Sequence, residues 1–491
     1  MLRPWKLVLD GVQASRSMPL YLQIVHALIH EIERGRLRSG SFLPSSRELA
    51  ESLGVNRKTV VLAYEDLIAQ GWLISSATRG TVVSRSLPAP LPNRKRPASR
   101  VVEPKDATPD YKFNPPPARS LALPVGKWLK LDEGSPDGRL FPADVLSRAY
   151  RSSMRRAFRE NRLLYRDPRG SHLLREKVAE MLTSERGLAV AAENICITRG
   201  SQNGIFITAR TLISPGDTVL VEALTYEAAV AALASCGARI VSVKLDEEGV
   251  DIADVERQCR AHSVKAIFLT PHHQFPTTVA LRPQRRLRLL ELSRQFGFAI
   301  IEDDYDHEFH FESQPLLPMA SYAPSRVIYV GSLSKLMLPA LRIGYIAAPK
   351  PFIDAAAHTV SLIDAMGNTL TEDAAAELIE NGELRRHARK VFQVYAARRL
   401  AFGRTLTAEL GDIAHFRVPD GGLAFWLTFP RIADLDRIEA QLPALGVRVA
   451  DSRSFATSKS APRGLRLGFA SLREDEASAA IRALARAARS S

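Results

Sequence analysis

The sequence predicts a multidomain protein, in which a small α+β domain with a helix-turn-helix precedes a large α/β domain. Three observations predict this. The chain has 491 residues, which is too long for one ordinary domain. Residues 19–83 contain helical patterns joined by a tight glycine turn and then a hairpin pattern. From about residue 116 onward, β-branched runs and helical stretches alternate, as in sheets with crossover helices.

The composition is that of a globular protein and excludes several classes. Hydrophobic residues make up 46% and charged residues 24% of the chain, which excludes a disordered or fibrous protein. No apolar run approaches the roughly 20 residues of a membrane span, and no signal-peptide core begins the chain. The 3 cysteines lack metal-ligand spacing and fit a reducing compartment. We therefore expect a cytoplasmic protein with no membrane contact and no metal site.

The net charge of +14 is unevenly distributed. Residues 70–105 contain a single acidic residue, Glu103, and many basic ones. The basic residues are Arg79, Arg85, Arg94, Lys95, Arg96, Arg100 and Lys105. Prolines between positions 88 and 104 favour extended, solvated chain, so we interpret residues 86–115 as a Pro-rich basic linker. Solvation and contact with a nucleic-acid backbone explain its charge equally well.

Two helices open the N-terminal domain. The first begins at Pro19 and ends before Gly35. Its apolar residues, which recur at helical spacing, are Leu20, Ile24, Leu28 and Ile32. The second begins at a capping box formed by Ser45 and Glu48 and stops at Gly54.

A third helix over residues 55–70 follows directly, so that the second and third helices form a helix-turn-helix. The N-terminal end of the second helix of such a motif reads base edges in DNA. The candidate readers are Asn56, Arg57, Lys58 and Thr59. Residues 73–83 alternate like a hairpin with a polar tip, which we interpret as a wing. Arg79 at this tip is placed to touch a phosphate or to enter a minor groove.

Residues 15–85 resemble the GntR family of winged helix-turn-helix regulators. The matching segments are Leu43-Pro44-Ser45-Ser46-Arg47, Leu53-Gly54-Val55-Asn56-Arg57 and Gly80-Thr81-Val82. The resemblance implies that Arg47, Arg57, Thr59 and the wing glycine Gly80 contact double-stranded DNA. The alternative is a small helical domain with a solvated basic face. We treat residues 1–85 as a DNA-binding domain.

Residues 116–491 are predicted to form the large α/β domain. Its short β-branched runs lack alternation, as expected for strands buried on both faces of a mostly parallel sheet. The runs are residues 194–198, 218–222, 266–270, 299–303 and 327–330. Ligands of such sheets gather at the carboxyl ends of the strands, so the segments that follow the strands are the candidate site.

Three strand ends carry chemistry. Residues 199–204 form a small-residue turn that opens a helix and suits an anion. Residues 302–306 place carboxylates at the site; one could keep a pyridine nitrogen protonated, while metal ligation or a solvated turn would explain them equally well. Lys335 follows small hydroxyl residues and could form a Schiff base, and Arg342 could pair with a phosphate dianion.

In this order, the three elements resemble the fold-type I pyridoxal-phosphate (PLP) superfamily, and specifically class I aminotransferases, over residues 130–475. The resemblance implies that Lys335 forms an internal aldimine with PLP. Asp303 would face the pyridine nitrogen, and Tyr305 would hydrogen-bond the phenolic oxygen. The residues implied for the phosphate are Gly200, Ser201, Gln202, Ser332 and Arg342.

The same resemblance implies three further roles. Tyr226 lies where an aromatic ring commonly stacks on the cofactor. Tyr165 matches a tyrosine that reaches the phosphate from a neighbouring subunit. Arg466 matches an arginine that grips an amino-acid carboxylate and is the candidate effector-binding residue, with a rim ion pair as the alternative.

The whole chain resembles the MocR (GabR-type) bacterial regulators, which join a GntR-type reader to an aminotransferase-like domain. In working aminotransferases an asparagine bonds the phenolic oxygen, whereas Phe275 stands at that position here and Thr278 replaces a glycine. Phenylalanine cannot make that hydrogen bond, which favours a regulator. Two departures from the regulator pattern are His272, where a small residue is common, and Leu224-Thr225 before Tyr226.

The resemblance implies a PLP-dependent transcriptional regulator that senses an amine, an amino acid or PLP itself through an aldimine at Lys335. An active PLP-dependent aminotransferase with an attached DNA-binding domain is the alternative. A DNA-binding protein whose large domain is an inactive scaffold is a third hypothesis. We expect at most weak or partial transamination. The resemblance further implies a head-to-tail homodimer on paired or repeated half-sites of promoter DNA, associated with the nucleoid when bound.

Overall fold

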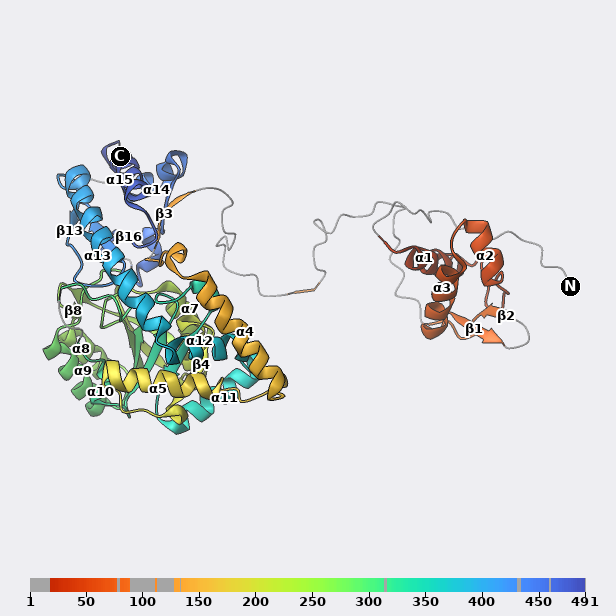
Figure 1. The fold of residues 1–491 in the computed structure, drawn as a ribbon, viewed down its shortest axis with the longest axis horizontal. Helices are drawn as coiled ribbons and strands as arrows, with labels where there is room; N and C mark the ends of the chain where they lie inside the picture. Colours follow the sequence, from red (N-terminus) through yellow and green to blue (C-terminus); the bar gives the residue numbers. More distant parts are fainter. Residues whose placement is uncertain are drawn as a thin grey trace. The chain divides into compact units, whose positions relative to one another are not determined.

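The computed structural model describes residues 18–76, 80–88, 111–112, 128–132, 134–312, 316–430, 434–458 and 461–490. The chain divides into two compact units, Met1–Leu121 and Ala122–Ser491 (Figure 1). Arg79 and most of the predicted linker lie outside the described residues. The division at residues 85 and 116 therefore stays a prediction. Among the helices of the described residues, none is long and apolar enough to cross a membrane.

The N-terminal unit is a three-helix domain with a two-stranded antiparallel wing. Its elements are α1 (Leu20–Glu33), α2 (Ser46–Leu53), α3 (Arg57–Ala69), β1 (Leu73–Ser76) and β2 (Gly80–Val83). The wing pairs Leu73 with Val83 and ends at the pair of Ser76 and Gly80. The predicted helix-turn-helix and wing are confirmed.

Local chemistry fixes the ends of α2. The Ser45 hydroxyl accepts from the backbone N–H of Glu48 at 3.3 Å, and the backbone N–H of Ser45 donates to the Glu48 carboxylate at 2.8 Å. Gly54 ends the helix in the left-handed region, with φ 64°. One hydrophobic cluster then holds the three helices together. Its fully buried members include Ile24, Leu28, Leu49, Val60 and Leu67.

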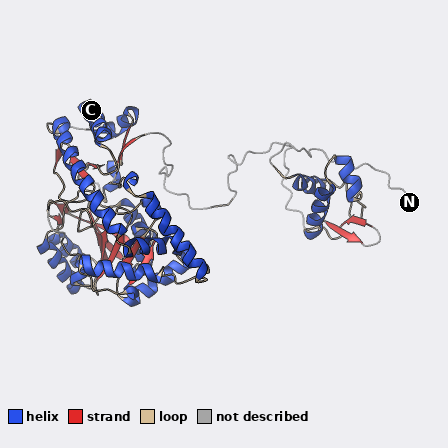
Figure 2. Ribbon diagram, in the orientation of Figure 1, coloured by secondary structure: helices blue, strands red, loops and turns tan. Residues whose placement is uncertain are grey.

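The large unit is built on a seven-stranded sheet with the order β4-β12-β11-β10-β9-β5-β6 (Figure 2). The strands are β4 (Ile195–Thr198), β5 (Thr218–Glu222), β6 (Arg239–Val243), β9 (Val264–Leu269), β10 (Ala299–Asp304), β11 (Val327–Ser332) and β12 (Gly344–Ala347). All neighbouring pairs are parallel except those of β12, which is antiparallel to β4 and to β11. Five strands were predicted, and β6 and β12 were not.

Helices cover both faces of this sheet, and hydrophobic clusters mark each contact. One face packs against α6 (Ser201–Leu212), α7 (Glu227–Ser235) and α11 (Lys350–Asp364). The other face packs against α4 (Ala143–Arg159), α5 (His172–Arg186), α8 (Ile252–Ala261), α9 (Pro283–Phe296), α10 (Met319–Tyr322) and α12 (Thr369–Glu380). This double covering explains why the strands read as continuous apolar runs.

A second layer completes the large unit. Its helices are α13 (Glu383–Leu410), α14 (Leu435–Gln441) and α15 (Glu474–Arg489). Its strands are β3 (Leu129–Leu131), which pairs with β15 (Val447–Val449), and a sheet of β13 (His415–Phe416), β14 (Ala424–Thr428) and β16 (Leu465–Gly468). A small hairpin of β7 (Leu245–Asp246) and β8 (Gly249–Val250) lies after β6. The main sheet and this layer have separate hydrophobic cores.

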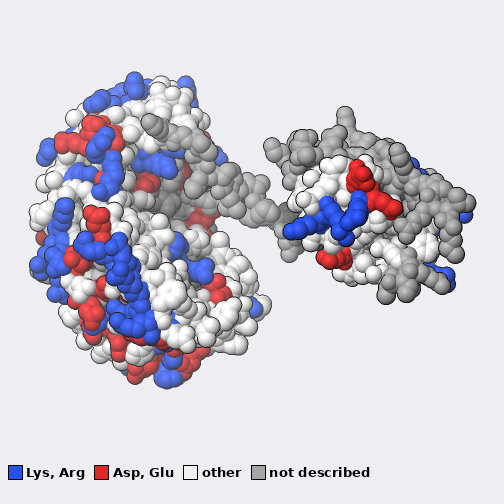
Figure 3. All heavy atoms as spheres, turned by 45° about the vertical axis from the view of Figure 1, so that its right-hand side comes forward, with Lys and Arg blue, Asp and Glu red and all other residues white. Residues whose placement is uncertain are grey.

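The charge of the large unit is mixed. On the face that Figure 3 shows, Lys and Arg side chains lie beside Asp and Glu side chains. Many of the surface arginines form ion pairs, such as Arg489 with Asp412 at 2.7 Å. Such exposed pairs contribute little to the free energy of unfolding. We interpret much of the excess charge of the chain as solvated surface.

Candidate functional site

The register of the central strands brings three predicted segments to one place. Thr198 of β4 pairs with Gly344 of β12, and Gly344 pairs with Ser332 of β11. A Cβ atom on Gly344 would lie only 2.6 Å from the backbone carbon of Gly200. The turn at Gly200, the end of β11 and the start of β12 are therefore in direct contact.

The segment at Gly200 has the geometry of an anion site. Gly200 has φ 81° and precedes α6, so the first N–H groups of that helix, from Ser201 and Gln202 onward, have no helical acceptor. The Arg342 guanidinium donates to the Arg199 carbonyl at 2.8 Å. A Cβ atom on Gly200 would meet Nη2 of Arg342 at 2.9 Å. Only glycine therefore lets this guanidinium lie against the turn.

Serine hydroxyls lie at the end of β11. The Ser332 side chain is 5% exposed, and its oxygen accepts from the backbone N–H of Ser334 at 3.1 Å. The hydroxyl of Ser334 is buried and has no hydrogen-bond partner among the described residues. A buried hydroxyl without a partner is costly, so the segment suits a ligand rich in hydrogen-bond acceptors.

Lys335 follows these serines and is half-buried. Its Nζ donates to the carbonyl of Gly134 at 2.7 Å. Gly134 lies between β3 and α4 with φ 95°, and a Cβ atom on it would lie 3.3 Å from Leu423. The lysine amine therefore contacts the N-terminal segment of the large unit, which in turn packs beside β14.

Asp303, at the end of β10, is 4% exposed. Its Oδ1 has no hydrogen-bond partner among the described residues. Burial, and then the neighbouring Asp304 and Asp306, raise the pKa of Asp303 to about 8. A ligand that brings a positively charged N–H to this oxygen would lower that pKa and satisfy the carboxylate.

Tyr305 and Arg466 form a second polar group beside the Asp303 strand end. The Tyr305 hydroxyl donates to the His273 carbonyl at 3.0 Å, and burial raises the pKa of Tyr305. Arg466 is 1% exposed; it donates to the Pro276 carbonyl at 2.7 Å and to the Tyr305 oxygen at 3.3 Å. Its guanidinium also lies 4.6 Å from the centre of the Phe275 ring.

Aromatic rings line the space next to Arg466. The Phe275 ring centre lies 5.4 Å from that of Tyr226, 6.0 Å from that of Tyr305 and 5.6 Å from that of Phe455. The Tyr226 hydroxyl donates to the Gln202 side chain at 3.4 Å, which connects this aromatic group to the anion turn. Contacts thus link Tyr305 through Phe275 and Tyr226 to Gln202 at the anion turn.

Tyr165 is separate from this group. Its side chain is 87% exposed, and the neighbouring Leu163 and Leu164 are exposed by 46% and 71%. Exposed apolar side chains at this density mark an interaction surface. The predicted reach of Tyr165 into a neighbouring subunit stays a prediction.

The DNA-reading candidates lie on the surface of the N-terminal unit. Arg47, Arg57 and Lys58 are exposed, and Arg57 donates to the Ser46 hydroxyl at 3.3 Å. The Asn56 side-chain carbonyl oxygen caps α3 by accepting from the Lys58 N–H at 2.9 Å, so Asn56 has a structural role as well. Thr59 is half-buried on the first turn of α3, and Gly80 is exposed at the wing.

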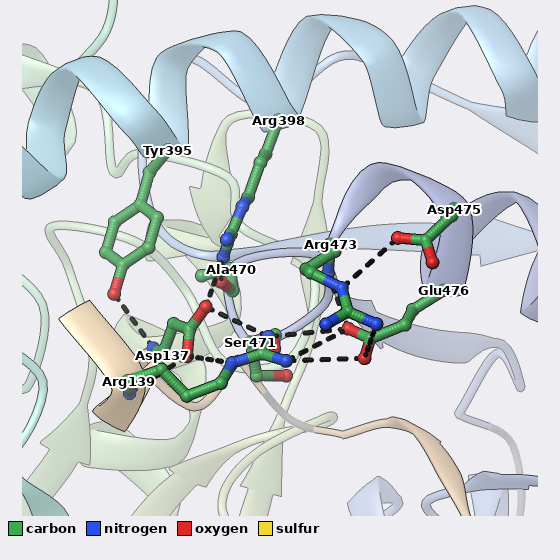
Figure 4. Close-up of polar contacts among 9 residues, drawn as sticks. All are labelled: Asp137, Arg139, Tyr395, Arg398, Ala470, Ser471, Arg473, Asp475 and Glu476. Atoms are coloured by element: carbon green, nitrogen blue, oxygen red, sulfur yellow. Dashed lines mark hydrogen bonds and ion pairs between the residues drawn. The ribbon is translucent and has the colours of Figure 1, made fainter.

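A polar network surrounds Asp137, which follows the Gly134 segment in the chain (Figure 4). The residue types alone did not indicate this network. The Asp137 carboxylate accepts from Arg139 at 2.8 Å and from Arg398 of α13 at 2.9 Å. The Asp137 N–H donates to the Tyr395 hydroxyl at 2.9 Å. Arg139 also pairs with Glu476 of α15 at 3.3 Å. The segment that contacts Lys335 is therefore fastened to α13 and α15.

This constellation defines a class: a PLP-dependent aminotransferase fold carried on the same chain as a winged helix-turn-helix. The family model for aminotransferase class I and II matches residues 126–484, and that for bacterial regulatory proteins of the gntR family matches residues 20–83. The chain belongs to the MocR-type regulators, in which these two domains are joined.

Named relatives support this membership. The probable rhizopine catabolism regulatory protein MocR of Rhizobium meliloti is 30% identical over 95% of this chain and 92% of its own length. The pyridoxine biosynthesis regulator PdxR of Corynebacterium glutamicum is 29% identical over 92% of both chains. The kynurenine aminotransferase structure from Pyrococcus horikoshii, in complex with PMP, has a TM-score of 0.70 at 26% identity and covers 74% of this chain and 92% of that one.

Proposed function

We propose that this chain is a transcriptional regulator whose N-terminal unit binds double-stranded promoter DNA and whose large unit binds PLP and senses an amine, an amino acid or PLP itself. One observation carries the proposal. The large unit has an anion turn, the amine of Lys335 and the buried Asp303, whose Oδ1 has no hydrogen-bond partner among the described residues. The same chain has an exposed basic helix end at the start of α3. Chromosomal DNA as the ligand implies work in the bacterial cytoplasm.

The residues present fit PLP at both of its ends. Its phosphate would lie at Gly200, Ser201 and Gln202, with Arg342 and Ser332 beside them, where helix N–H groups and a guanidinium favour a dianion. Its ring nitrogen would face the unpartnered oxygen of Asp303. When bound, PLP supplies an aldehyde that joins reversibly to a primary amine, so that Lys335 and an amine effector compete for it.

The residues around the proposed PLP ring then have separate roles. Asp303 would keep the ring nitrogen protonated, because its carboxylate would pair with the resulting cation. Tyr305 stays a neutral phenol, and its hydroxyl would have to turn from the His273 carbonyl to donate to an oxygen of the ligand. Tyr226 and Phe275 provide the aromatic wall of the ring pocket.

Arg466 is the proposed contact for the carboxylate or other anionic group of an effector. Its guanidinium is buried and holds the Pro276 carbonyl and the Tyr305 oxygen. The guanidinium has five N–H donors, so an anion can bind beside these contacts. An effector anion that draws the guanidinium toward itself would shift the segment around Pro276 and Tyr305 with it, and such a difference between states is what allows an effector to shift an equilibrium.

An active aminotransferase is the second candidate function, because the large unit has the fold of aminotransferases of known structure. Phe275 argues against efficient turnover. Its ring lies between Tyr226 and Tyr305 and offers no hydrogen bond at the position where working enzymes use asparagine. We therefore propose weak or partial transamination at most.

We further propose that the chain acts as a head-to-tail homodimer with Tyr165 completing the phosphate site of its partner. The exposed Leu163, Leu164 and Tyr165 provide an apolar surface for such a contact. Two DNA-reading units in one dimer would favour paired or repeated half-sites.

The test compares DNA binding and turnover in one protein preparation. Candidate amines are titrated against the visible absorbance of the PLP-loaded protein, and those that change it are added to a DNA-binding assay with promoter fragments. We expect an amine-dependent change in DNA affinity, lost in Lys335→Ala, and a steep fall of affinity with salt. Lys350→Ala, which changes an exposed lysine on α11, is the matched control. Sustained keto-acid production without any change in DNA affinity would overturn the proposal.

A further inference from the structure

Four histidines and an aspartate lie together near Asp303. They are not among the proposed cofactor residues. His272 and His273 follow β9, Asp304 ends β10, and His307 and His310 lie in the segment after β10. The neighbouring positions of β9 and β10 in the sheet bring these segments together. We call His272, Asp304, His307 and His310 the histidine cluster.

The histidine cluster is buried and compact. His272 and Asp304 are each 3% exposed and His307 is 8% exposed. One nitrogen of each of these two histidines and one Asp304 oxygen lie within 4.8 Å of one another. The rings of His272 and His307 are stacked, with centres 4.5 Å apart, and the His310 ring stands edge-on to His272 at 4.4 Å.

The contact between His272 and His310 is unusual. Their Nε2 atoms face one another at less than an ordinary hydrogen-bond distance. A ring nitrogen that carries no proton can bind a metal, so these two facing nitrogens are candidate donors.

Asp304 has the complementary properties. Its side chain is buried among the rings of His272 and His307. Its Oδ2 accepts from His307 Nδ1 at 2.9 Å and from the Tyr329 hydroxyl at 2.6 Å. Its Oδ1 is buried and has no partner among the described residues.

Positive charge is already balanced around this carboxylate. Arg186 lies 3.8 Å from Asp304, but it also pairs with Glu308 at 2.5 Å, so the two carboxylates share one guanidinium. The cluster thus offers imidazole nitrogens and a carboxylate oxygen, which suit a divalent transition-metal ion.

We propose that the histidine cluster binds one divalent transition-metal ion of the Zn²⁺ type. His272, His307 and Asp304 supply three ligands, and water or another donor completes the coordination. Zn²⁺ prefers a four-coordinate set of imidazole and carboxylate donors, whereas Mg²⁺ and Ca²⁺ prefer oxygen alone. Metal ligation was an alternative for residues 302–306 in the sequence, but the metal group also needs His272 from a separate segment, so no metal site was predicted.

A metal bound at this site would affect the neighbouring cofactor site. Asp304 is adjacent to Asp303, and the backbone carbonyl of His273 accepts from Tyr305. A metal that joins the segment after β9 to the segment after β10 would hold Asp303 and Tyr305 in fixed positions. The role is one of positioning, and it does not depend on whether the large unit senses an amine.

The test measures the metal itself. The full chain is treated with a chelator, dialysed, and titrated with Zn²⁺ and with Co²⁺ as a coloured probe. We expect one Zn²⁺ per chain after dialysis and a visible Co²⁺ spectrum of a nitrogen- and oxygen-ligated site. His272→Ser and His307→Asn should each weaken binding by about 100-fold or more, since even loss of a partner behind a ligand costs about 10–100-fold. PLP absorbance and thermal unfolding establish whether the variants are folded.

His172→Gln is the matched control, because His172 is an exposed histidine on α5 beside Glu176. It should leave stoichiometry and affinity unchanged. Two outcomes would overturn the proposal. The first is a wild-type chain that retains no Zn²⁺ and gives no Co²⁺ spectrum, which needs no variant to interpret. The second is binding that persists equally in folded His272→Ser and His307→Asn, which would place the metal on surface histidines.

Discussion

In the N-terminal unit, the candidate DNA-reading residues that the structure describes are mostly exposed and come mainly from one turn of one helix. In the large unit, the candidate cofactor residues come from several strand ends, and Gly200, Asp303 and Ser332 among them are buried. The first kind of site needs a stable support beneath it. The second kind includes residues of the core, which carry both folding and function. Substitutions should therefore separate binding from stability in the first unit and couple them in the second.

The largest effect is expected from the support of the DNA-reading helices. Leu49 of α2 is fully buried in the cluster that joins the three helices. Leu49→Ala should lower the free energy of unfolding of the N-terminal unit by about 2–5 kcal/mol, because a cavity replaces buried contacts. DNA binding should fall with it, and PLP binding should be unchanged.

Leu62→Ala is its control, since Leu62 of α3 is 52% exposed. It should change stability by less than about 0.5 kcal/mol. Denaturant unfolding of both variants, followed in parallel with PLP absorbance, checks the prediction. A loss of PLP binding in Leu49→Ala would show that the two units do not fold independently.

A smaller effect is expected at Asp303, where a substitution should lower PLP affinity without lowering stability. Asp303→Asn removes a carboxyl whose burial is unfavourable in the protein alone, so stability without PLP should not fall. PLP affinity should fall by roughly 10- to 150-fold, the equivalent of a charged hydrogen bond of about 1.5–3 kcal/mol. A PLP absorbance titration measures it. Unchanged affinity would mean that Asp303 does not face the ring nitrogen.

The smallest effect concerns acid stability. Although burial alone would raise it, hydrogen bonds from Arg139 and Arg398 hold the pKa of Asp137 below its ordinary value. A lowered carboxyl pKa stabilises the fold above the unfolded value of about 3.9, and that contribution is lost as the pH falls through the folded pKa. Asp137→Asn should therefore cost about 1 kcal/mol near neutral pH and flatten the acid limb of the unfolding curve.

Asp475→Asn is the control for this network, because Asp475 is an exposed partner of Arg473 in the same region (Figure 4). It should leave the acid limb unchanged within about 0.5 kcal/mol. Unfolding of both variants at a series of pH values is the measurement. Equal pH dependence in Asp137→Asn and the unsubstituted chain would contradict the assigned role of Asp137.

The local features were predictable from the sequence. The capping box of Ser45 and Glu48, the glycine end of α2 and the buried strand runs depend on neighbours in the chain, and the structure confirms them. The segment at Gly344 was interpreted only as part of a motif, and it forms β12, which is antiparallel. A strand of 4 residues is too short to reveal its direction.

Contacts that depend on the sheet order could not be predicted. The histidine cluster exists because β9 and β10 are neighbours, and the Gly134 carbonyl reaches Lys335 across 201 residues of chain. The Asp137 network likewise joins segments 261 residues apart. The roles of Tyr226, Arg466 and the DNA-reading residues stay predictions, since each depends on a ligand.

The central claim is that the effector site and the DNA site are coupled in one chain. Linkage requires that an effector changes DNA affinity by the same factor by which DNA changes effector affinity. The decisive measurement is the effector dissociation constant of the PLP-loaded protein with and without saturating promoter DNA. The account predicts a factor different from one and equal to the effector-induced change in DNA affinity, typically about 5- to 150-fold. An effector affinity that is the same with and without DNA would contradict it.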